Sequence, residues 1–134
     1  CISPDLMHAL MTMGHGEEII LCDADFPAAT TGRRIIRADG LTLTPLLEAI
    51  LPFFPLDSFV PKPAAMMDCR DWGADPVVLY ESFRQIVRKH APKFSDFELV
   101  KRFDFYERAR GAYALVVTSE PDGNIILKKG PVMM

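Results

Sequence analysis

The sequence predicts an α/β fold, a three-layer α/β/α sandwich in which helices cover both faces of a central sheet. Short apolar runs typical of buried strands alternate along the chain with segments of helical periodicity. The strand runs are too apolar to face water, so the sheet needs helices on both sides. With 134 residues, 49% of them hydrophobic, the chain can bury one substantial core, and we expect a single domain over residues 1–134.

A helix is predicted at the start of the chain. Ser3 is a suitable N-cap, and Pro4 fits the first helical position, where a backbone N–H is not needed. Gly14 is expected to end the helix. Four apolar side chains are expected to share its inward face: Leu6, Met7, Leu10 and Met11.

Three strands and a second helix are predicted in the next part of the chain. The apolar run at 19–22 is too short for a helix and indicates a strand buried on both faces, directly followed by Asp23. Residues 34–37 predict a short strand, and residues 64–69 predict another buried one. Between these two strands, residues 44–51 predict a helix that is ended by the proline that follows.

The second half continues the alternation of helices and strands. Asp75 and Pro76 are expected to begin one long helix that ends near His90. Its inward side chains are expected to be Leu79, Phe83, Ile86 and Val87. Three further strands are predicted over 97–102, 114–118 and 124–127, with a helix over 103–112.

Composition and charge exclude several classes of partner. Fifteen basic and eighteen acidic residues give a formal net charge of −3 without a basic cluster, so neither nucleic acid nor an acidic membrane surface is an expected partner. No apolar run reaches the roughly 18 residues that a membrane-spanning helix needs. Nine Phe and seven Met residues supply more apolar surface than a monomer of this size hides, which favours self-association.

The cysteine pattern indicates a reducing compartment, and we expect a cytoplasmic protein. Cys1, Cys22 and Cys69 are odd in number and widely spaced, without a C-x-x-C pair, which argues against a disulfide framework and against a zinc site. The sequence contains no P-loop, no G-x-S-x-G motif of a serine nucleophile and no G-x-G-x-x-G motif for dinucleotide binding. A chain that opens with Cys1 in place of Met is expected to have lost its natural beginning.

Polar residues stand at the predicted ends of apolar strands, where ligands usually bind in α/β proteins. His15 lies between two glycines ahead of the first strand, and Asp23 follows that strand. Arg102 is expected to close another strand, and Asn124 to open the last one. Each has an ordinary structural explanation as a turn residue, a cap or a surface ion-pair partner. Together they could face a polyhydroxy ligand, with His15 and Asp23 as a possible proton-transfer pair.

The sequence resembles the L-fucose mutarotases, which belong with the D-ribose pyranases in one superfamily. The resemblance runs from Ile2 to about Val132, and its IRADG and FYERA stretches favour the fucose branch. Six blocks in the family's order carry it: MGHGEEII (13–20), DADFP (23–27), IRADGL (36–41), PLDS (55–58), RFDFYERA (102–109) and GNIILKKG (123–130).

This resemblance implies a mixed central sheet, the interconversion of sugar anomers, and no cofactor or metal. It also implies a homo-oligomer, a decamer, with active sites between subunits. The expected substrate is a monosaccharide, L-fucose, and the alternatives are a D-ribose pyranase-type activity or a non-catalytic sugar-binding protein.

The resemblance also assigns roles to matching residues. His15 matches the family's acid/base residue, Asp23 a group that accepts from sugar hydroxyls, and Arg102 a donor to the sugar. Further substrate contacts are implied for Asp57, Tyr106 and Asn124.

One stretch departs from the family's pattern. The family has a site tyrosine before Gly-Asn, whereas this chain reads Thr118-Ser119-Glu120-Pro121-Asp122-Gly123-Asn124 and is two residues shorter. Either the turn is shorter and Asp122, with Gly123, occupies the place of the tyrosine at the substrate, or the sequence lacks two residues of a longer natural loop. Loss of the tyrosine would weaken sugar binding and would favour the non-catalytic alternative.

Overall fold

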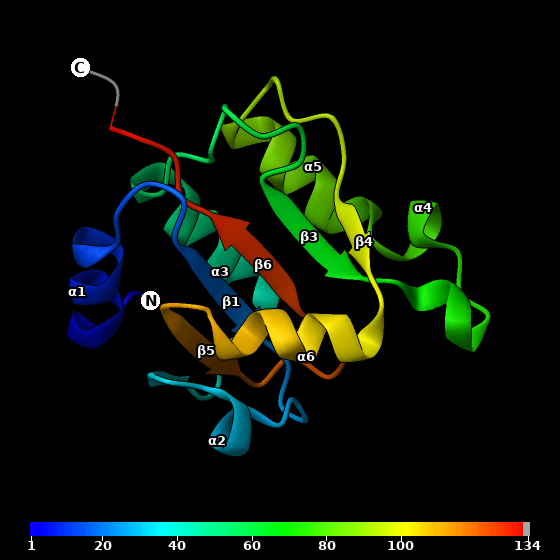
Figure 1. Cartoon of the computed structure of the whole chain (residues 1–134), viewed down its shortest axis with the longest axis horizontal. Helices are drawn as coiled ribbons and strands as arrows, with labels where there is room; N and C mark the ends of the chain where they lie inside the picture. Colours follow the sequence, from blue (N-terminus) through cyan, green and yellow to red (C-terminus); the bar gives the residue numbers. More distant parts are fainter. Residues whose placement is uncertain (133–134) are drawn as a thin grey trace.

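A six-stranded sheet in the order β2-β5-β1-β6-β3-β4 runs through the centre of the computed structural model, which describes residues 1–132 (Figure 1). Strand β6 is antiparallel to both of its neighbours, β1 and β3, whereas the other neighbouring pairs are parallel. The predicted mixed sheet is therefore confirmed. Its strands are β1 (Glu18–Cys22), β2 (Ile35–Ala38), β3 (Ala64–Met67), β4 (Glu98–Val100), β5 (Ala114–Thr118) and β6 (Ile125–Lys128).

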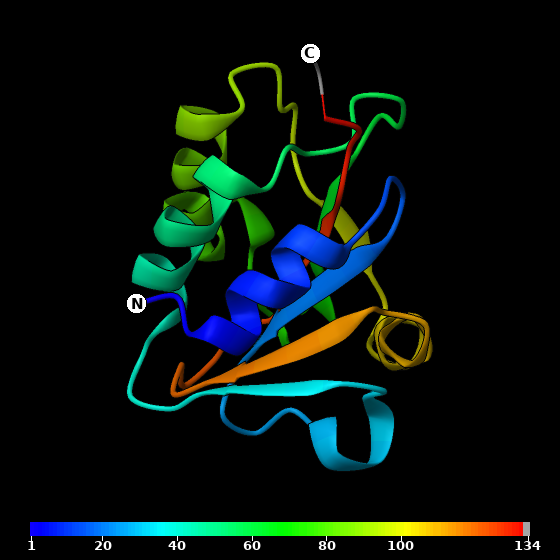
Figure 2. The same cartoon turned by 90° about the vertical axis from the view of Figure 1, so that its left-hand side faces the viewer.

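Helices cover both faces of the sheet, which confirms the three-layer prediction (Figure 2). One layer holds α1 (Pro4–Thr12), α3 (Leu43–Ile50) and α5 (Glu81–His90), and the other holds α2 (Ala28–Thr31) and α6 (Arg102–Arg110). Connections add the short helices η1 (Leu51–Phe53), η2 (Cys69–Trp72) and α4 (Pro76–Leu79). Within residues 1–132, no helix combines the length and the apolar character that crossing a membrane requires.

Strand β1 shows why the core is divided into two parts. Ile19 and Leu21 point into the layer of α1, α3 and α5, while Ile20 and Cys22 point into the layer of α2 and α6. Successive side chains of a strand face opposite sides of the sheet, so a run of four apolar residues is buried on both. The prediction of a doubly buried strand is thus confirmed.

The first helix begins as predicted, but Met11 does not lie on its inward face. The Ser3 hydroxyl accepts a hydrogen bond from the Leu6 amide at 3.2 Å, and Met13 caps the other end. The buried face consists of Leu6, Ala9 and Leu10, which follow the i, i+3, i+4 spacing of one helical stripe. Met11 lies about 100° further round the helix and is exposed.

The long helix predicted after Asp75 is two helices, α4 and α5, separated at Tyr80. Asp75 caps α4 as predicted, since its carboxylate accepts from the Val77 amide at 2.9 Å. The backbone leaves the helical conformation at Tyr80, whose hydroxyl donates to the carbonyl of Met67 at 2.6 Å. Tyr80 therefore enters the core in place of Leu79, which is exposed, contrary to the prediction.

Two predicted strands end earlier than the sequence indicated. Strand β3 stops at Met67, because the Asp68 carboxylate accepts from the Arg70 amide and caps the short helix η2. Strand β4 stops at Val100, and Arg102 does not close it but is the first residue of α6. The helix begins one residue earlier than predicted, since the Phe105 amide donates to the carbonyl of Lys101, the residue before Arg102, at 2.8 Å.

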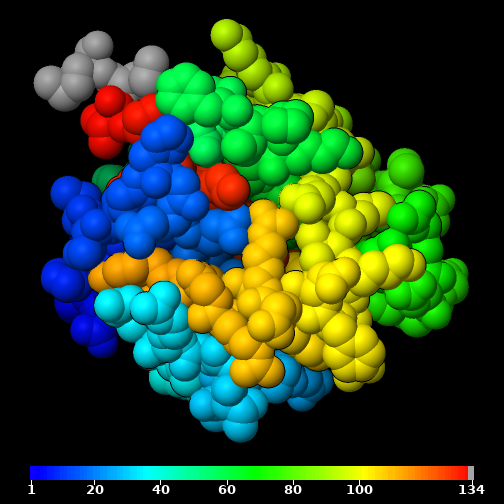
Figure 3. Space-filling model, viewed as in Figure 1, coloured from blue at the N-terminus to red at the C-terminus, as the bar shows by residue number. Residues whose placement is uncertain are grey.

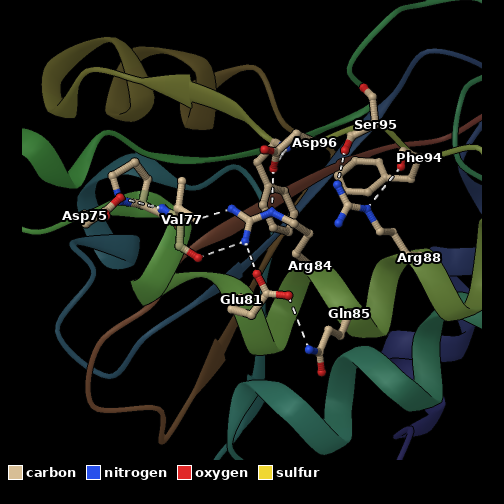
Figure 4. Close-up of polar contacts among 11 residues, drawn as sticks. Asp75, Val77, Glu81, Arg84, Gln85, Arg88, Phe94, Ser95 and Asp96 are labelled. Carbon is tan, nitrogen blue, oxygen red and sulfur yellow. Dashed lines mark hydrogen bonds and ion pairs between the residues drawn. The ribbon is translucent and has the colours of Figure 1, made fainter.

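A buried guanidinium fastens α4 to α5 (Figure 4). Arg84 is only 5% exposed and donates to the carboxylates of Asp96 at 2.8 Å and Glu81 at 2.9 Å. It also donates to the backbone carbonyls of Pro76 and Val77, each at 3.1 Å. A buried charge is tolerated when it is paired and hydrogen-bonded, and these four acceptors meet that requirement.

We expect Arg84→Met to lower the free energy of unfolding by about 1–3 kcal/mol, because two carbonyls and two carboxylates lose their donor. Urea denaturation measures this loss. The matched control is Arg110→Met, which removes an exposed guanidinium from α6 and should change stability by less than about 0.5 kcal/mol. Equal effects of the two substitutions would contradict the prediction.

Candidate functional site

The predicted site residues lie at opposite ends of the sheet. His15 precedes β1. Asp57 lies beside the C-terminal end of β6, where its backbone amide donates to the Lys128 carbonyl at 3.0 Å. Asp23 follows β1, and Asn124 immediately precedes β6. Strand β1 alone separates the two ends by about 13 Å at 3.3 Å per residue. One monosaccharide cannot reach both ends within a single chain.

At one end, His15 and Asp57 form a pair, which we call the His15 pair. The Nε2 atom of His15 lies 3.0 Å from Oδ1 of Asp57, and the imidazole ring lies against Phe59 with ring centroids 5.3 Å apart. Asp57 is 3% exposed, while the His15 side chain is 44% exposed. The pair therefore combines a buried carboxylate with an imidazole that solvent or a ligand can reach.

The carboxylate of the His15 pair is held in its ionised form. Burial alone would raise the pKa of Asp57, but hydrogen bonds from the Phe59 amide and from His15 outweigh it and lower the pKa below the ordinary value. An ionised carboxylate accepts from Nε2–H of a neutral imidazole. When Nε2 carries the proton of this hydrogen bond, the lone pair of the neutral imidazole is on Nδ1.

Gly16 gives the turn at His15 the backbone conformation that it needs. Its φ is 86°, in the left-handed region that favours glycine, and a hydrogen bond from its amide to the Lys129 carbonyl measures 2.8 Å. Figure 3 shows the segment before β1, in blue, lying against the end of β6 and the chain that follows it, in red. This contact places His15 at the end of the sheet.

At the opposite end, Asp23, Gly123 and Asn124 form a second group, which we call the Asp23 cluster. Oδ2 of Asp23 accepts from the Asn124 side-chain amide at 3.0 Å and from the Gly123 backbone amide at 3.3 Å. In return, Oδ1 of Asn124 accepts from the Asp23 backbone amide at 2.9 Å. The cluster thus fixes Asp23 and Asn124 against each other across 101 residues of sequence.

The Asp23 carboxyl has an environment opposite to that of Asp57. Burial raises the pKa of Asp23 above its ordinary value, although hydrogen bonds from Gly123, Asn124 and the Asp25 amide act in the other direction. A carboxyl with a raised pKa is a stronger proton acceptor once it is ionised. Asp23 is therefore suited to accept a hydrogen bond from a ligand hydroxyl.

The short turn before Gly123 is closed by hydrogen bonds on both sides. The carbonyl of Glu120 accepts from the Ala24 amide at 2.9 Å, and its carboxylate accepts from the Leu43 amide at 3.0 Å. Asp122 is exposed at the tip, next to the Asp23 cluster. Its predicted role in place of a tyrosine stays a prediction.

Arg102 and Tyr106 lie at the same end of the sheet as the Asp23 cluster. Nε of Arg102 donates to the Tyr106 hydroxyl at 3.1 Å. The Tyr106 ring packs edge-to-face with the ring of Phe26, in the loop after Asp23, with centroids 5.4 Å apart. Arg102 also lines an open cleft of about 550 Å³. The other residues that line this cleft are Asp71, Trp72, Lys101, Phe103 and Asp104.

A second pocket, of about 450 Å³, lies beside Asp57 and is lined mainly by apolar side chains such as Pro61 and Phe94. In the part of the chain that the structure describes, no three His, Cys, Asp or Glu side chains are arranged to hold a metal ion.

The sequence did not predict a role for Phe59 or Lys129, because their contacts with the His15 turn arise only when the chain is folded. The run LKKG, which contains Lys129, was the only available signal.

The fold and the two ends define a small α/β protein with a mixed six-stranded sheet. A histidine–carboxylate pair lies at one end of this sheet, and a carboxylate and an amide lie at the other with a guanidinium at the same end, groups that can form hydrogen bonds with hydroxyls. The chain belongs to the RbsD / FucU transport protein family, whose model matches residues 1–132. It is 45% identical over 131 residues to an L-fucose mutarotase from Glaesserella parasuis serovar 5 (strain SH0165), covering 96% of this chain and 90% of that protein.

Solved structures agree with this membership. The fucose mutarotase of Streptococcus pneumoniae in complex with L-fucose is 41% identical, with a TM-score of 0.87, covering 98% of this chain and 95% of that one. The RbsD of Bacillus subtilis complexed with D-ribose is 16% identical, with a TM-score of 0.75, covering 99% of this chain and 96% of that one. The second likeness shows the shared fold alone.

The lowered pKa of Asp57 predicts how stability depends on pH. An acid whose pKa is lower in the folded state stabilises the fold above its unfolded pKa, about 4, and this contribution is lost as pH falls through the folded value. The free energy of unfolding of the wild type should therefore fall more steeply below pH ~4 than that of Asp57→Asn. Urea denaturation at several pH values measures the difference. Asp104→Asn, at an exposed position on α6, is the control and should follow the wild type.

Proposed function

We propose that the protein is an isomerase that interconverts the α and β anomers of L-fucose. The observation that carries this proposal is the His15 pair, a reachable imidazole held by a buried ionised carboxylate. Relatives named for this activity are 45% and 41% identical over nearly the whole chain, which supports L-fucose as the sugar. The cysteine pattern supports a cytoplasmic location.

The chemistry requires only proton transfers. Removal of a proton from the anomeric hydroxyl and delivery of one to the ring oxygen breaks the bond between the ring oxygen and the anomeric carbon and gives the open aldehyde. After rotation about the bond to the aldehyde carbon, the same hydroxyl adds to the other face and the protons return. We assign His15 as the acid/base that exchanges these protons, and Asp57 as the group that orients its ring.

The remaining predicted residues are assigned to sugar binding. Asp23 accepts from sugar hydroxyls, Arg102 donates to them, and charge-assisted hydrogen bonds of both kinds are stronger than neutral ones. Tyr106 holds the Arg102 guanidinium in the geometry described above. Asn124, with Gly123 and Asp122, completes the wall of the site. Because Asp57 is almost fully buried, we place it behind His15 instead of in contact with the sugar.

The active site is proposed to form between two copies of the chain in a homo-oligomer, a decamer. His15 and the Asp23 cluster lie at opposite ends of β1, so they can meet on one sugar only if a second copy brings one of them. Exposed apolar side chains, among them Phe103, Val78 and Phe59, provide surface for such contacts.

A second candidate function is sugar binding without turnover. It rests on the short turn at Asp122, where the family's tyrosine has no counterpart in this sequence. Calorimetric binding of L-fucose without accelerated anomer exchange would favour this candidate. Faster pyranose–furanose exchange of D-ribose than anomer exchange of L-fucose would instead favour a ribose-type activity.

We expect His15→Ala to slow the exchange between L-fucose anomers by about 10²–10⁴-fold, the usual contribution of a positioned acid/base group. Saturation-transfer NMR at equilibrium measures the exchange rate without a coupled assay. His8→Ala is the matched control, because His8 is exposed on α1, and it should retain the wild-type rate. Undiminished exchange in His15→Ala would rule out the assigned role.

Mixing two impaired variants tests the site between subunits. His15→Ala and Arg102→Ala should each have strongly reduced activity. Unfolding and refolding them together should restore part of the activity, because some interfaces then hold one intact copy of each residue. Refolding each variant alone is the control. If mass spectrometry shows that mixed oligomers have formed and these recover no activity, the shared site is contradicted. Analytical ultracentrifugation of the wild type measures whether the assembly is a decamer.

A further inference from the structure

The ammonium group of Lys129 is buried beneath the turn that carries His15. Lys129 follows β6 and is 7% exposed, and its Nζ donates to the carbonyls of Leu10 and Met13, each at 2.7 Å. These carbonyls belong to the C-terminal end of α1, where carbonyls lack helical partners and the helix dipole favours a cation. Lys129 therefore fixes the point at which the chain leaves α1 and enters the His15 turn.

The backbone of Lys129 holds the other side of the same turn. Its carbonyl accepts from the Gly16 amide at 2.8 Å, and its amide donates to the Glu17 carbonyl at 2.9 Å. The carboxylate of Glu17 closes the turn by accepting from the Gly14 amide at 2.6 Å. Lys129 thus contacts the chain on both sides of His15, at Met13 before it and at Gly16 after it.

Gly130 sets the position of the second member of the His15 pair. Its amide donates to the Pro55 carbonyl at 2.7 Å, and a Cβ at this position would lie 2.7 Å from the Leu56 carbonyl oxygen and 2.9 Å from Asp57 Cα. Only a glycine permits so close an approach of two backbones. His15 and Asp57 are therefore both placed against residues 128–130.

We propose that Lys129 is a positioning residue for His15, and that with Gly130 it fixes the geometry of the His15 pair. A hydrocarbon side chain would fill the same space without the cost of burying a charge, so the ammonium is explained by the carbonyls that it holds. Lys129 does not contact the sugar. The inference rests on the proposed function only in taking His15 as the proton-transfer residue.

The test is Lys129→Met, studied in the full-length protein. We expect kcat for anomer exchange to fall on the order of 100-fold, as for other small misplacements of a reacting group. KM for L-fucose should change little, because Asp23 and Arg102 are at the other end of the sheet. Hydrogen exchange of the peptide around Gly16, followed by mass spectrometry without sugar, should accelerate.

Two controls separate positioning from a general loss of stability. Lys62→Met removes an exposed ammonium and should leave kcat, KM and hydrogen exchange at wild-type values. Leu115→Ala truncates the core in the layer of α2 and α6, so it should lower the melting temperature without lowering kcat at temperatures where the protein stays folded. The proposal is overturned if Lys129→Met folds and has the wild-type kcat. It is also overturned if the kcat of Lys129→Met falls no further than that of Leu115→Ala.

Gly130→Ala provides a second route to the same answer if Lys129→Met does not fold. It should lower kcat with little change in KM, because the added Cβ displaces Asp57 from His15. Gly111→Ala is its control, since a Cβ there has ordinary contacts. A Gly130→Ala protein with wild-type kcat overturns the proposal. If the wild type does not accelerate anomer exchange, the proposed function is wrong, whatever the variants do. Unchanged hydrogen exchange at Gly16 in Lys129→Met would overturn the positioning role of Lys129 independently of activity.

Discussion

The pairing of β6 between β1 and β3 is the interaction on which both ends of the site depend. Strand β6 is antiparallel to both neighbours and joins two parallel parts of the sheet. At the N-terminal end of β6, Gly123 and Asn124 contact Asp23. At its C-terminal end, residues 128–130 contact the His15 turn and the segment that carries Asp57. A shift of one residue in this register would turn the buried side chains of β6 to the opposite faces and would break both sets of contacts.

The two carboxylates of the site have opposite environments. Hydrogen bonds from Phe59 and His15 outweigh burial at Asp57 and lower its pKa, whereas burial dominates at Asp23 and raises it. Different pKa shifts allow chemically identical groups to take different roles. Asp57 can hold an imidazole in one orientation, while Asp23 can share a proton with a hydroxyl. Lys129 adds a buried cation that is bound by carbonyls instead of by a carboxylate.

Local patterns determined most of the helices and strands, and the buried face of several of them, although Met11 and Leu79 are exposed where the spacing predicted burial. The Ser3 cap, the doubly buried β1 and the alternation of strands with helices followed from capping chemistry and from the spacing of apolar residues. Boundaries failed where a distant contact intervened. Tyr80, whose hydroxyl donates to the Met67 carbonyl, separates the predicted long helix into two. Arg102 begins a helix instead of closing a strand, because the first helical hydrogen bond runs from the Phe105 amide to the Lys101 carbonyl.

The sequence by itself determined the fold class, the residue types of the site and the resemblance that assigns them. It could place His15 and Asp23 near strand ends, because both lie within a few residues of one apolar run. Only the tertiary structure decided that His15 meets Asp57, 42 residues away, and that Asn124 meets Asp23, 101 residues away. The physical reason is that such contacts depend on strand order and register, which arise from packing across the whole sheet and leave no local periodic signal.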